Sequence, residues 1–430
     1  MGVREQTRLA ESLIQAVMAP KRLLVGLIGV GGFGASHLKA LSQLEAEGLV
    51  RLVCVADPAG ERLVDTRRRL ESVDVRWHTE YRSLLEQESE LDAVAIAAPI
   101  HLHLEIAAAA LTRELFVYLE KPPVPLIQQF NELIALDVAK RIAVGFQLIN
   151  SSAVQQLKLW RTQGVLGDLR NVRVHGSSPR SAGYYARTPW AGKMVFDGKP
   201  VFDGPATNAL SHWLHNIMYL AAKRGDEFDR PTVIEAELYR ARAIESYDTI
   251  CLRGRLESGV DFHFAVTHAA EKSLPCRLEL TGSKGGAWIV EKETVAANDL
   301  GLPVTVVPCS DPFLENWRQF VRFARGEESR AATHLEDARG YVLATNAALM
   351  SSGDIHNSCW QQAQTRAGCA DDGEGGAELA ALVERSAQEG RLFSEITVPL
   401  ARKGLPVQVR HVCSLELSDY FAKGDTRSKS

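Results

Sequence analysis

The sequence predicts an α/β fold, in which a doubly wound parallel sheet is followed by an α+β domain with a large, mainly antiparallel open sheet. From about residue 21 to 145, short and nearly continuous apolar runs alternate with helical patterns, as expected for a parallel sheet covered on both faces. After about residue 150 the apolar runs lengthen, and several alternate with a period of two. This change indicates a second domain.

The first half of the chain contains five expected strands, and a helix follows each of the first four. The short strand runs are bounded by turn residues, whereas the helical stretches place apolar residues three and four positions apart. The expected strands are 23–30, 51–58, 91–99, 116–122 and 142–147, and the expected helices are 35–48, 61–72, 103–115 and 127–141.

The second half combines longer strands with a few helices. TGSKGG, residues 281–286, has the composition of a hairpin turn, and residues 368–378 read as a linker or exposed loop. The expected strands are 171–178, 232–242, 249–258, 260–269, 276–282, 286–292 and 406–412, with helices at 152–168, 312–326 and 335–352. We predict a helical extension at 1–20, a nucleotide-binding domain at 21–146, a substrate-binding and oligomerisation domain at 147–365, and a C-terminal extension at 366–430.

The composition argues against several functional classes. The chain has 430 residues, enough for two or three domains, and its net charge is −4 without a long basic run, which disfavours nucleic-acid binding. No apolar stretch has the length of a membrane span, the N-terminus lacks the apolar run of a secretory signal, and the seven cysteines form no CxxC pair. We therefore expect a cytoplasmic protein that binds neither nucleic acid nor a membrane.

The stretch LLVGLIGVGGFGASHL predicts a dinucleotide-binding turn. It has GxGxxG spacing between an expected strand and an expected helix, which is the context that gives this short motif its meaning. The helix N-terminus would hold the diphosphate. Asp57 ends the next strand, where a carboxylate binds the ribose hydroxyls and repels a 2′-phosphate, so NAD is favoured over NADP. The expected cofactor contacts in the turn are Gly29, Gly31, Gly32, Phe33 and Gly34.

Glu120 and Lys121 follow directly after another apolar strand. In a doubly wound sheet, ligands bind at the carboxyl ends of the strands, so Lys121 is expected to face the cleft. Two prolines after it stiffen the backbone. The alternative interpretation is an exposed loop lysine paired with Glu120.

TNALSHWLHN, residues 207–216, places two histidines three positions apart. If residues 207–221 form a helix, then Asn208, His212, His215 and Tyr219 share a polar, uncharged face, and we expect that face to border a cleft or interface. The histidines could bind a metal, although no carboxylate or cysteine on that face completes a ligand set. They could also be packed residues with hydrogen-bond partners. We favour a catalytic role, with His212 as the proton acceptor, and expect no metal.

The chain resembles the Gfo/Idh/MocA family, which includes glucose-fructose oxidoreductase and inositol dehydrogenase. The matching stretches include GLIGVGGFGASHL, VADP, LEKPP, GVLGDLRNVRVHG and LTGSKGGAWI, and together they lie within residues 23–352 in the family's order. The resemblance implies a Rossmann domain, an open-sheet second domain, NAD(P)-linked oxidation of sugars or polyols, and a homo-oligomer (dimer or tetramer). It places the lysine of the EKP motif on Lys121 and the Pro-x-x-x-His element on Pro99 and His103, and it makes Glu120 a cofactor contact.

The same resemblance places the catalytic histidine on His212, with one departure from the pattern. The family has Asp-x-x-x-His followed three residues later by Asp, whereas this chain has Asn208 and His215 at the two aspartate positions. An aspartate would stabilise an imidazolium, whereas Asn208 can only orient the ring. This departure puts ordinary dehydrogenase turnover in question.

The resulting hypothesis is a dehydrogenase in which a sugar hydroxyl lies between Lys121 and His212. His212 removes the proton while Lys121 stabilises the alkoxide, or Lys121 itself is the base. Gln147 is a candidate contact for the nicotinamide or substrate. Two alternatives are a redox-neutral, NAD-dependent sugar lyase or glycosidase and a non-catalytic NAD-sensing regulator. Three aromatic residues could stack on a sugar or pack the domain joint: Tyr184, Tyr185 and Trp190.

Overall fold

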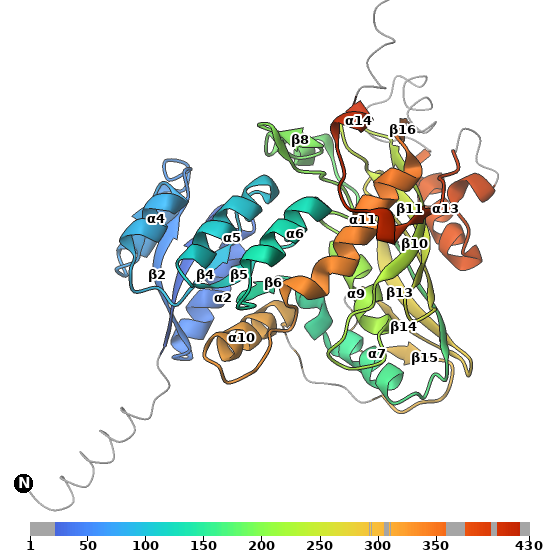
Figure 1. Ribbon diagram of the computed structural model, residues 1–430, viewed down its shortest axis with the longest axis horizontal. Coiled ribbons are helices and arrows are strands. Elements are labelled where there is room, and N and C mark those ends of the chain that lie inside the picture. Colours follow the sequence, from blue (N-terminus) through green and yellow to red (C-terminus); the bar gives the residue numbers. More distant parts are fainter. Residues whose placement is uncertain are drawn as a thin grey trace, which may run out of the picture.

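The computed structural model describes residues 22–291, 293, 295–304, 309, 311–357, 375–396 and 402–421. The described chain forms two lobes, each built on one large sheet, with helix α11 (Arg339–Ser352) between them (Figure 1). The predicted extension at residues 1–20 lies outside the described part. No helix that the structure describes is long and apolar enough to cross a bilayer.

The first sheet has six parallel strands in the order β3-β2-β1-β4-β5-β6. This order confirms the predicted doubly wound sheet, whose two halves diverge between β1 and β4. The edge strand β3 was not expected, because its three residues are too few and too exposed to give an apolar run. The strands are β1 (Leu23–Ile28), β2 (Val50–Ala56), β3 (Arg76–His78), β4 (Ala93–Ile96), β5 (Phe116–Leu119) and β6 (Ile142–Val144).

Helices cover this sheet, and one of them comes from far along the chain. Helix α10 (Pro312–Ala324) packs beside α2, and its Trp317 ring stacks on Tyr118 of β5 at 4.5 Å between centroids. Asn316 donates a hydrogen bond to the Tyr118 hydroxyl at 2.8 Å. The apolar face of α10 thus completes the core of the first lobe. The other helices are α2 (Gly34–Ala46), α3 (Val64–Glu71), α4 (Tyr81–Gln87), α5 (His103–Thr112) and α6 (Ile127–Leu136).

The second sheet has nine strands and is mainly antiparallel, as predicted. Its main path runs β15-β14-β13-β7-β12-β11-β10-β16, with β17 paired to β10, and only the β7–β12 and β10–β16 pairs are parallel. The predicted hairpin at TGSKGG joins β13 to β14. The strands are β7 (Leu169–Ser177), β10 (Pro231–Arg240), β11 (Thr249–Leu256), β12 (Asp261–Thr267), β13 (Leu274–Gly282), β14 (Gly286–Val290), β15 (Ala297–Asn298), β16 (Ile355–Asn357) and β17 (Val407–Gln408).

Several predicted boundaries were wrong. Helix α9 (Ser211–Ala221) begins at residue 211 and not at 207, because residues 204–210 form turns. The expected helix at 335–352 is a 3₁₀ turn, η3 (Leu335–Ala338), followed by α11. Residues 368–374 of the expected loop lie outside the described residues. The remaining residues, 375–378, belong to helix α13 (Gly375–Glu389). The strand expected at 406–412 is reduced to β17.

The C-terminal segment is attached to both lobes. Its helix α13 packs on β7 and β12 of the second sheet, where Ser386 lies 3.2 Å from the Nε2 of His263. Further along, β17 pairs with β10, and Leu415 exchanges two main-chain hydrogen bonds with the Gln128 side chain of α6 at 2.9 and 3.2 Å. The segment therefore covers part of the second sheet and fastens it to the first lobe.

Candidate functional site

The glycine turn after β1 is shaped for close approach of a ligand. Gly29 has φ +91°, and a Cβ there would lie 2.6 Å from the carbonyl oxygen of Ala97. A Cβ on Gly34, the first residue of α2, would collide with the carbonyl oxygen of Gly29. At Gly32, with φ +56°, a Cβ would meet nothing within 4 Å. The turn is thus tightly packed at Gly29 and Gly34 and open at Gly32. This shape fits a diphosphate bound at a helix N-terminus.

Asp57 closes this turn from the neighbouring strand. Its Oδ2 accepts hydrogen bonds from the amides of Val30 (2.8 Å) and Gly31 (3.0 Å), and its Oδ1 accepts one from the amide of Ala59 (2.8 Å). Each carboxylate oxygen has two lone pairs, so Oδ1 retains capacity for a ribose hydroxyl. The carboxylate also fixes the shape of the glycine turn, a role that the sequence did not reveal.

Glu120 is buried and has two partners within the first lobe. Its Oε1 lies 3.1 Å from Nε2 of His37 on α2, and its Oε2 accepts a hydrogen bond from the amide of Lys121 at 3.1 Å. His37 is fully buried, and its ring has edge contacts with Phe33 and Tyr118. Glu120 was expected as a cofactor contact. Here it links the helix that starts at the glycine turn to the main chain at Lys121.

His103 links the loops that follow β4 and β5. Its Nδ1 lies 2.9 Å from the carbonyl oxygen of Pro122, and its Nε2 lies 2.9 Å from that of Ala98, next to Pro99. Burial lowers the pKa of this histidine, and a neutral imidazole has only one N–H to donate. Both nitrogens face main-chain oxygens, so the ring positions the strand-end loops that carry Pro99 and Lys121.

Lys121 reaches across the joint between the lobes. Its Nζ donates to the main-chain carbonyl of Asn208 at 2.9 Å and lies 3.4 Å from the Asn208 Oδ1. The Asn208 amide in turn donates to Oδ1 of Asp203 at 2.8 Å, and Oδ2 of Asp203 accepts from the amide of Gly192 at 2.7 Å. A buried carboxylate is therefore connected to the lysine through the asparagine. Asp203 could not be recognised from the sequence, because only folding places it near Lys121.

His212 lies on the first turn of α9, four residues beyond Asn208. It is 8% exposed, and its ring meets Phe146 edge to face at 5.7 Å. Its Nδ1 is buried and has no hydrogen-bond partner within the described chain. Burial lowers the pKa of His212 well below 6.5, and the nearby charge of Lys121 acts in the same direction. The imidazole is therefore neutral at neutral pH, and it lies close to the lysine.

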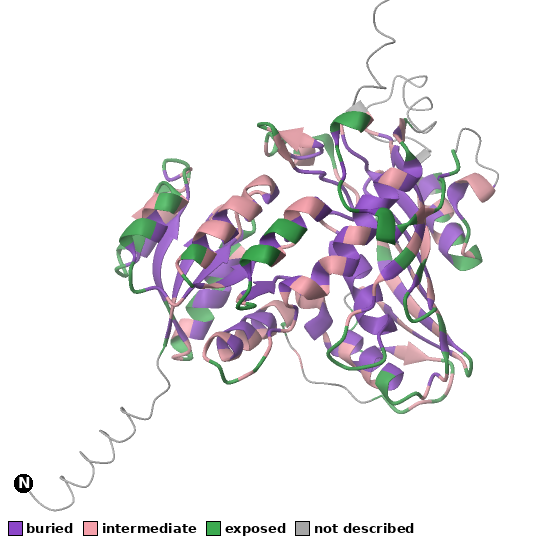
Figure 2. Cartoon of the chain, viewed as in Figure 1, coloured by how far each residue is buried: buried purple, intermediate pink, exposed green. Residues whose placement is uncertain are grey.

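His215 occupies a different environment from His212. It is fully buried between Phe146, at 3.9 Å between ring centroids, and Phe228, at 5.0 Å, and burial lowers its pKa to about 3. All eleven residues of α9 are buried (Figure 2), so the expectation of a face bordering a cleft was wrong for most of the helix. His215 is a packing residue in this arrangement. Nowhere in the described ranges do three His, Cys, Asp or Glu side chains gather in a metal-binding arrangement.

The expected aromatic residues separate into two groups. Tyr184, on the short helix α8 (Ala182–Ala186), lies between two arginines, with Arg187 at 4.0 Å and Arg180 at 4.7 Å from its ring centroid. Tyr185 meets Tyr184 edge to face at 5.2 Å, but its hydroxyl is buried. Trp190 lies partly exposed in the following loop, without a described contact to Lys121. Tyr184 is thus the aromatic residue that contacts two arginines directly, whereas Tyr185 is acted on by the charge of Asp203.

Gln147 opens the 3₁₀ turn η2 (Gln147–Asn150), directly after Phe146. Its Oε1 is buried, and the described residues offer it no hydrogen-bond partner. Because the preceding ring touches both histidines of α9, this unsatisfied acceptor lies near the junction of the lobes. Such an oxygen is expected to be satisfied by water or by a ligand.

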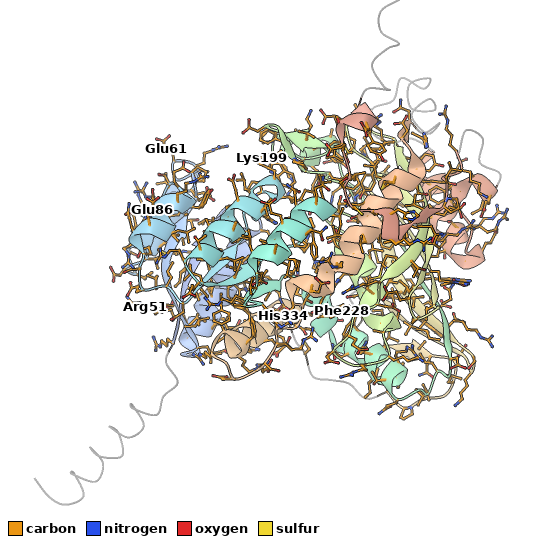
Figure 3. The ribbon with its side chains drawn as sticks, in the orientation of Figure 1. Arg51, Glu61, Glu86, Lys199, Phe228 and His334 are labelled. Carbon is orange, nitrogen blue, oxygen red and sulfur yellow. The ribbon has the colours of Figure 1, made fainter. Side chains whose placement is uncertain are left out.

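A small hairpin adds a second connection between the lobes. Strands β8 (Val195–Phe196) and β9 (Lys199–Pro200) belong to the second lobe, and Lys199 lies on this hairpin (Figure 3). Lys199 forms an ion pair of 2.8 Å with Glu105 of α5. The ring of Phe196 meets His101 at 5.2 Å, next to the loop that carries Pro99. The hairpin therefore holds the second lobe against the strand-end loops of the first.

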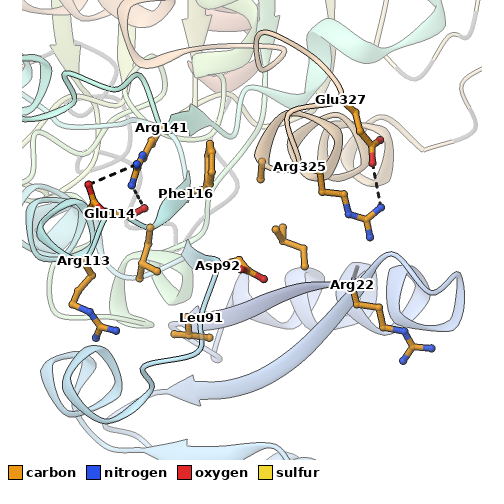
Figure 4. Close-up of a pocket in the computed structure, with 12 residues that line it drawn as sticks. Arg22, Leu91, Asp92, Arg113, Glu114, Phe116, Arg141, Arg325 and Glu327 are labelled. Carbon is orange, nitrogen blue, oxygen red and sulfur yellow. Dashed lines mark hydrogen bonds and ion pairs between the residues drawn. The ribbon is translucent and has the colours of Figure 1, made fainter. Parts of the chain in front are cut away.

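A separate cavity of about 610 Å³ lies at the opposite end of the first sheet (Figure 4). Its lining residues stand where strands begin, including Leu23 at the start of β1 and Phe116 at the start of β5. Arg141 in its wall stacks on the Phe116 ring at 5.7 Å. In a doubly wound sheet, cofactors bind at the carboxyl ends of strands, so this cavity is not part of the site around Lys121.

Comparison with known proteins shows which proteins this chain is similar to. The sequence model of an oxidoreductase family with an NAD-binding Rossmann fold matches residues 23–146. The rhizopine catabolism protein MocA of Rhizobium meliloti is 30% identical over 347 residues, covering 78% of this chain and 98% of the relative. The glycosyl hydrolase family 109 protein 1 of a Shewanella species is 27% identical over 248 residues, covering 53% of this chain and 51% of the relative.

Solved structures share the fold over about three quarters of this chain at low identity. The WlbA dehydrogenase of Bordetella pertussis, in complex with NADH and UDP-GlcNAcA, aligns with a TM-score of 0.64 at 21% identity, covering 77% of this chain and 96% of that one. A levoglucosan dehydrogenase in complex with NADH aligns with a TM-score of 0.66 at 17% identity, covering 77% and 97%. These alignments show a common fold. With the relationship to MocA, they establish that the chain belongs to the Gfo/Idh/MocA family of NAD(P)-dependent oxidoreductases, which act on CH–OH groups.

Proposed function

We propose that this protein is an NAD-dependent dehydrogenase of a sugar or polyol, with Lys121 and His212 as its catalytic residues. The observation that carries the proposal is the hydrogen bond from Lys121, at the carboxyl end of β5, to Asn208, which lies four residues before His212. This bond brings an ammonium from the nucleotide-binding lobe and an imidazole from the second lobe to one place. MocA, inositol 2-dehydrogenase and levoglucosan dehydrogenase, which are similar to this chain, support a polyhydroxylated substrate.

The residues of the glycine turn fit a dinucleotide. We expect the open amides at Gly32 and Phe33 and the N-terminus of α2 to hold the diphosphate, and Asp57 to hold the adenosine ribose. Since Asp57 is fixed beside the turn by three main-chain hydrogen bonds, a 2′-phosphate would meet a negative charge there. This repulsion favours NAD over NADP. When bound, NAD supplies the acceptor for the hydride.

The chain's own groups control the proton. The ammonium of Lys121 has three hydrogens and donates two of them to Asn208, one to the main-chain carbonyl and one to Oδ1. The third is left to bind the substrate oxygen and stabilise the alkoxide. Burial keeps His212 neutral, and a neutral imidazole accepts the hydroxyl proton. Asp203, connected through Asn208, places a negative charge near Lys121. It takes the place of the aspartate that the family pattern would put at position 208.

The roles of Lys121 and His212 could be exchanged, because burial also lowers the pKa of Lys121 from 10.5. A lysine with a lowered pKa is a candidate base. The dependence of kcat/KM on pH separates the two assignments. If His212 is the base and Lys121 acts as a cation, loss of activity at alkaline pH reports Lys121. If Lys121 is the base, activity instead rises with pH as it deprotonates.

The first experiment is a screen of sugars, polyols and sugar acids with NAD, following nicotinamide absorbance. On a substrate found this way, Lys121→Ala and His212→Ala should each reduce kcat by ~10²-fold or more. Full turnover by both variants would contradict the site assignment. Substrate oxidation with NADP but not with NAD would contradict the role given to Asp57.

A redox-neutral reaction is a second candidate, and the similarity to glycosyl hydrolase family 109 proteins favours it. In that case the hydride removed from a sugar carbon returns to it after an elimination or glycoside cleavage. Solvent deuterium would then enter the product without net formation of NADH. A net dehydrogenase would accumulate NADH with one equivalent of oxidised product.

A further inference from the structure

Two arginines flank one tyrosine beside the proposed site. Arg180 follows β7, and its amide donates to the carbonyl of His268 at 3.0 Å, which fixes its main chain. Arg187 follows α8. Their guanidinium carbons lie 4.7 and 4.0 Å from the centroid of the Tyr184 ring, so two positive charges are held close together by cation–π contacts.

These two arginines have no carboxylate counter-ion in the described part of the chain. Neither comes within 4.0 Å of an aspartate or glutamate oxygen, whereas Arg253 pairs with both Glu235 and Glu395 at 2.7 Å. The Nε of Arg180 is buried and has no hydrogen-bond partner among the described residues. Arg180 is partly buried, and cations removed from water usually have their charge compensated, so its missing counter-ion points to a ligand. Arg187 is exposed and adds a second positive charge on the other side of Tyr184.

The pair borders the groups assigned to the reaction. The charges of Arg180 and Arg187 both lower the pKa of Lys121, after the larger effect of burial, so all three cations lie in one neighbourhood. Asp203 is an acidic residue of the same lobe as the two arginines, and it lies near Lys121. Its two oxygens already accept hydrogen bonds from Gly192 and Asn208. The substrate side of Lys121 therefore carries an excess of positive charge.

The phosphates of the cofactor do not account for this charge. They are expected at the glycine turn and the N-terminus of α2, on the first lobe, whereas Arg180 and Arg187 belong to the second lobe. A neutral sugar would also leave both guanidinium groups uncompensated. Planar guanidinium groups match carboxylate and phosphate oxygens with paired hydrogen bonds.

We propose that the substrate is an anionic sugar or polyol, carrying a carboxylate or a phosphate ester, whose oxyanion is bound by Arg180 and Arg187 while its reacting hydroxyl meets Lys121. This inference rests on the proposed function and names the substrate class of the same site. The tyrosine between the arginines holds the two guanidinium groups at a fixed spacing. Specificity then comes from the distance between the oxyanion and the hydroxyl that is oxidised.

Equilibrium binding tests this inference separately from turnover. Glucose, glucuronate and glucose 6-phosphate are titrated by calorimetry into the protein saturated with NADH. One of the two anionic probes should bind ~10- to 100-fold more tightly than glucose, which is the range expected for charge-assisted hydrogen bonds. A preference for glucuronate identifies a carboxylate site, and a preference for glucose 6-phosphate identifies a phosphate site.

Arg187→Gln and Arg180→Gln should each remove most of that advantage and leave glucose binding unchanged. Arg385→Gln, on the exposed side of α13, is the matched control and should have no effect. If Arg180→Gln does not fold, Arg187→Gln decides alone, because Arg187 is exposed. Equal binding of all three probes, or an anion preference that survives both variants, would overturn the inference.

The two proposals fail in different ways. Arginine-dependent binding of an anionic probe, without oxidation of any anionic sugar tested, would support the anion site and count against the dehydrogenase. Efficient oxidation of a neutral sugar that is indifferent to Arg180→Gln and Arg187→Gln would support the dehydrogenase and overturn the anion site.

Discussion

The ammonium of Lys121 and the main-chain carbonyl of Asn208 are joined by a hydrogen bond of 2.9 Å that spans 87 positions of sequence. One partner ends a strand of the nucleotide-binding sheet, and the other precedes the helix that carries His212. This bond fixes the distance between the two proposed catalytic groups. Each variant that weakens it should therefore change catalysis more than stability.

Lys121→Met removes the ammonium and keeps much of the side-chain volume. We expect kcat to fall by ~10²- to 10⁴-fold, because both proton control and alkoxide stabilisation depend on this group. The melting temperature should stay the same or rise, since a partly buried charge is lost. Steady-state kinetics and thermal melts measure the two effects. Lys39→Met, at an exposed position of α2, is the control and should leave both unchanged.

Asp203→Asn should shift the pH profile. The carboxylate of Asp203 raises the pKa of Lys121, so its neutralisation lowers that pKa, and the limb of kcat/KM against pH that reports the lysine should move to lower pH. Asp226→Asn, at an exposed position, should not move it. An unshifted limb in Asp203→Asn would show that the negative charge does not act on the site.

The same substitution should not destabilise the protein at neutral pH. Burial raises the folded-state pKa of Asp203, so the folded state holds its proton more strongly than the unfolded chain does. Ionisation therefore weakens folding as pH rises from the unfolded pKa through the folded one, and the penalty is complete above both. Asparagine removes this penalty and keeps one acceptor for the Gly192 amide, while a flip of the Asn208 amide lets its oxygen accept from the new NH₂ group. A melting temperature that stays equal or increases, together with reduced kcat, is the expected pair of results.

Exchanging the two side chains tests whether Asn208 transmits the charge of Asp203. In Asn208→Asp alone, two carboxylates would lie close together, and one would keep its proton. In the double variant Asp203→Asn/Asn208→Asp, the single carboxylate lies where the family pattern has it. We expect the double variant to recover most of the kcat lost in Asp203→Asn, as measured on the same substrate. No recovery would mean that position 203 has a function of its own.

Asp57→Ser should change the choice of cofactor. Loss of the carboxylate removes the acceptor for the ribose hydroxyls, so we expect NAD to bind ~10-fold more weakly. It also removes the repulsion of a 2′-phosphate, so the affinity for NADP should stay the same or increase. Fluorescence titrations with both reduced cofactors give the ratio. Asp65→Ser, exposed on α3, is the control. A ratio that does not change in Asp57→Ser would place the ribose elsewhere.

Gly34→Ala tests the packing of the glycine turn. The added methyl group would meet the carbonyl oxygen of Gly29, and overpacking of this kind costs ~1–3 kcal/mol. We expect a lower melting temperature and weak cofactor binding. Gly225→Ala, where a Cβ would meet nothing within 4 Å, should change neither property. Normal cofactor affinity in Gly34→Ala would argue against diphosphate binding at this turn.

The sequence predicted what local patterns determine. Buried parallel strands are nearly continuous apolar runs, so five of the six strands of the first sheet were recognised, whereas the half-exposed strand β3 gave no such signal. The glycine turn, Asp57 and Lys121 were recognised because each stands at a fixed offset from a strand.

Properties that depend on long-range packing were not predictable in this way. A helical projection gave α9 one polar face, but helix α7 (Ser152–Thr162), helix α11 and the second sheet bury the whole of α9. Two phenylalanine rings enclose His215. Asp203, Arg180 and Arg187 lie in or next to the loop whose aromatic residues were predicted to contact a sugar, but no spacing in the sequence distinguishes these three charged residues from others. Their relation to Lys121 exists only after the lobes meet.

Helix α10 has a consequence for how the nucleotide-binding lobe can be made. Its Trp317 and Phe320 are fully buried in the core of that lobe, and its Asn316 bonds Tyr118. A truncated fragment ending near residue 146 would lack this wall and expose Tyr118 to water. During synthesis, all strands of the first sheet would leave the ribosome long before helix α10. The sheet surface that α10 covers would therefore stay exposed until most of the chain has been made.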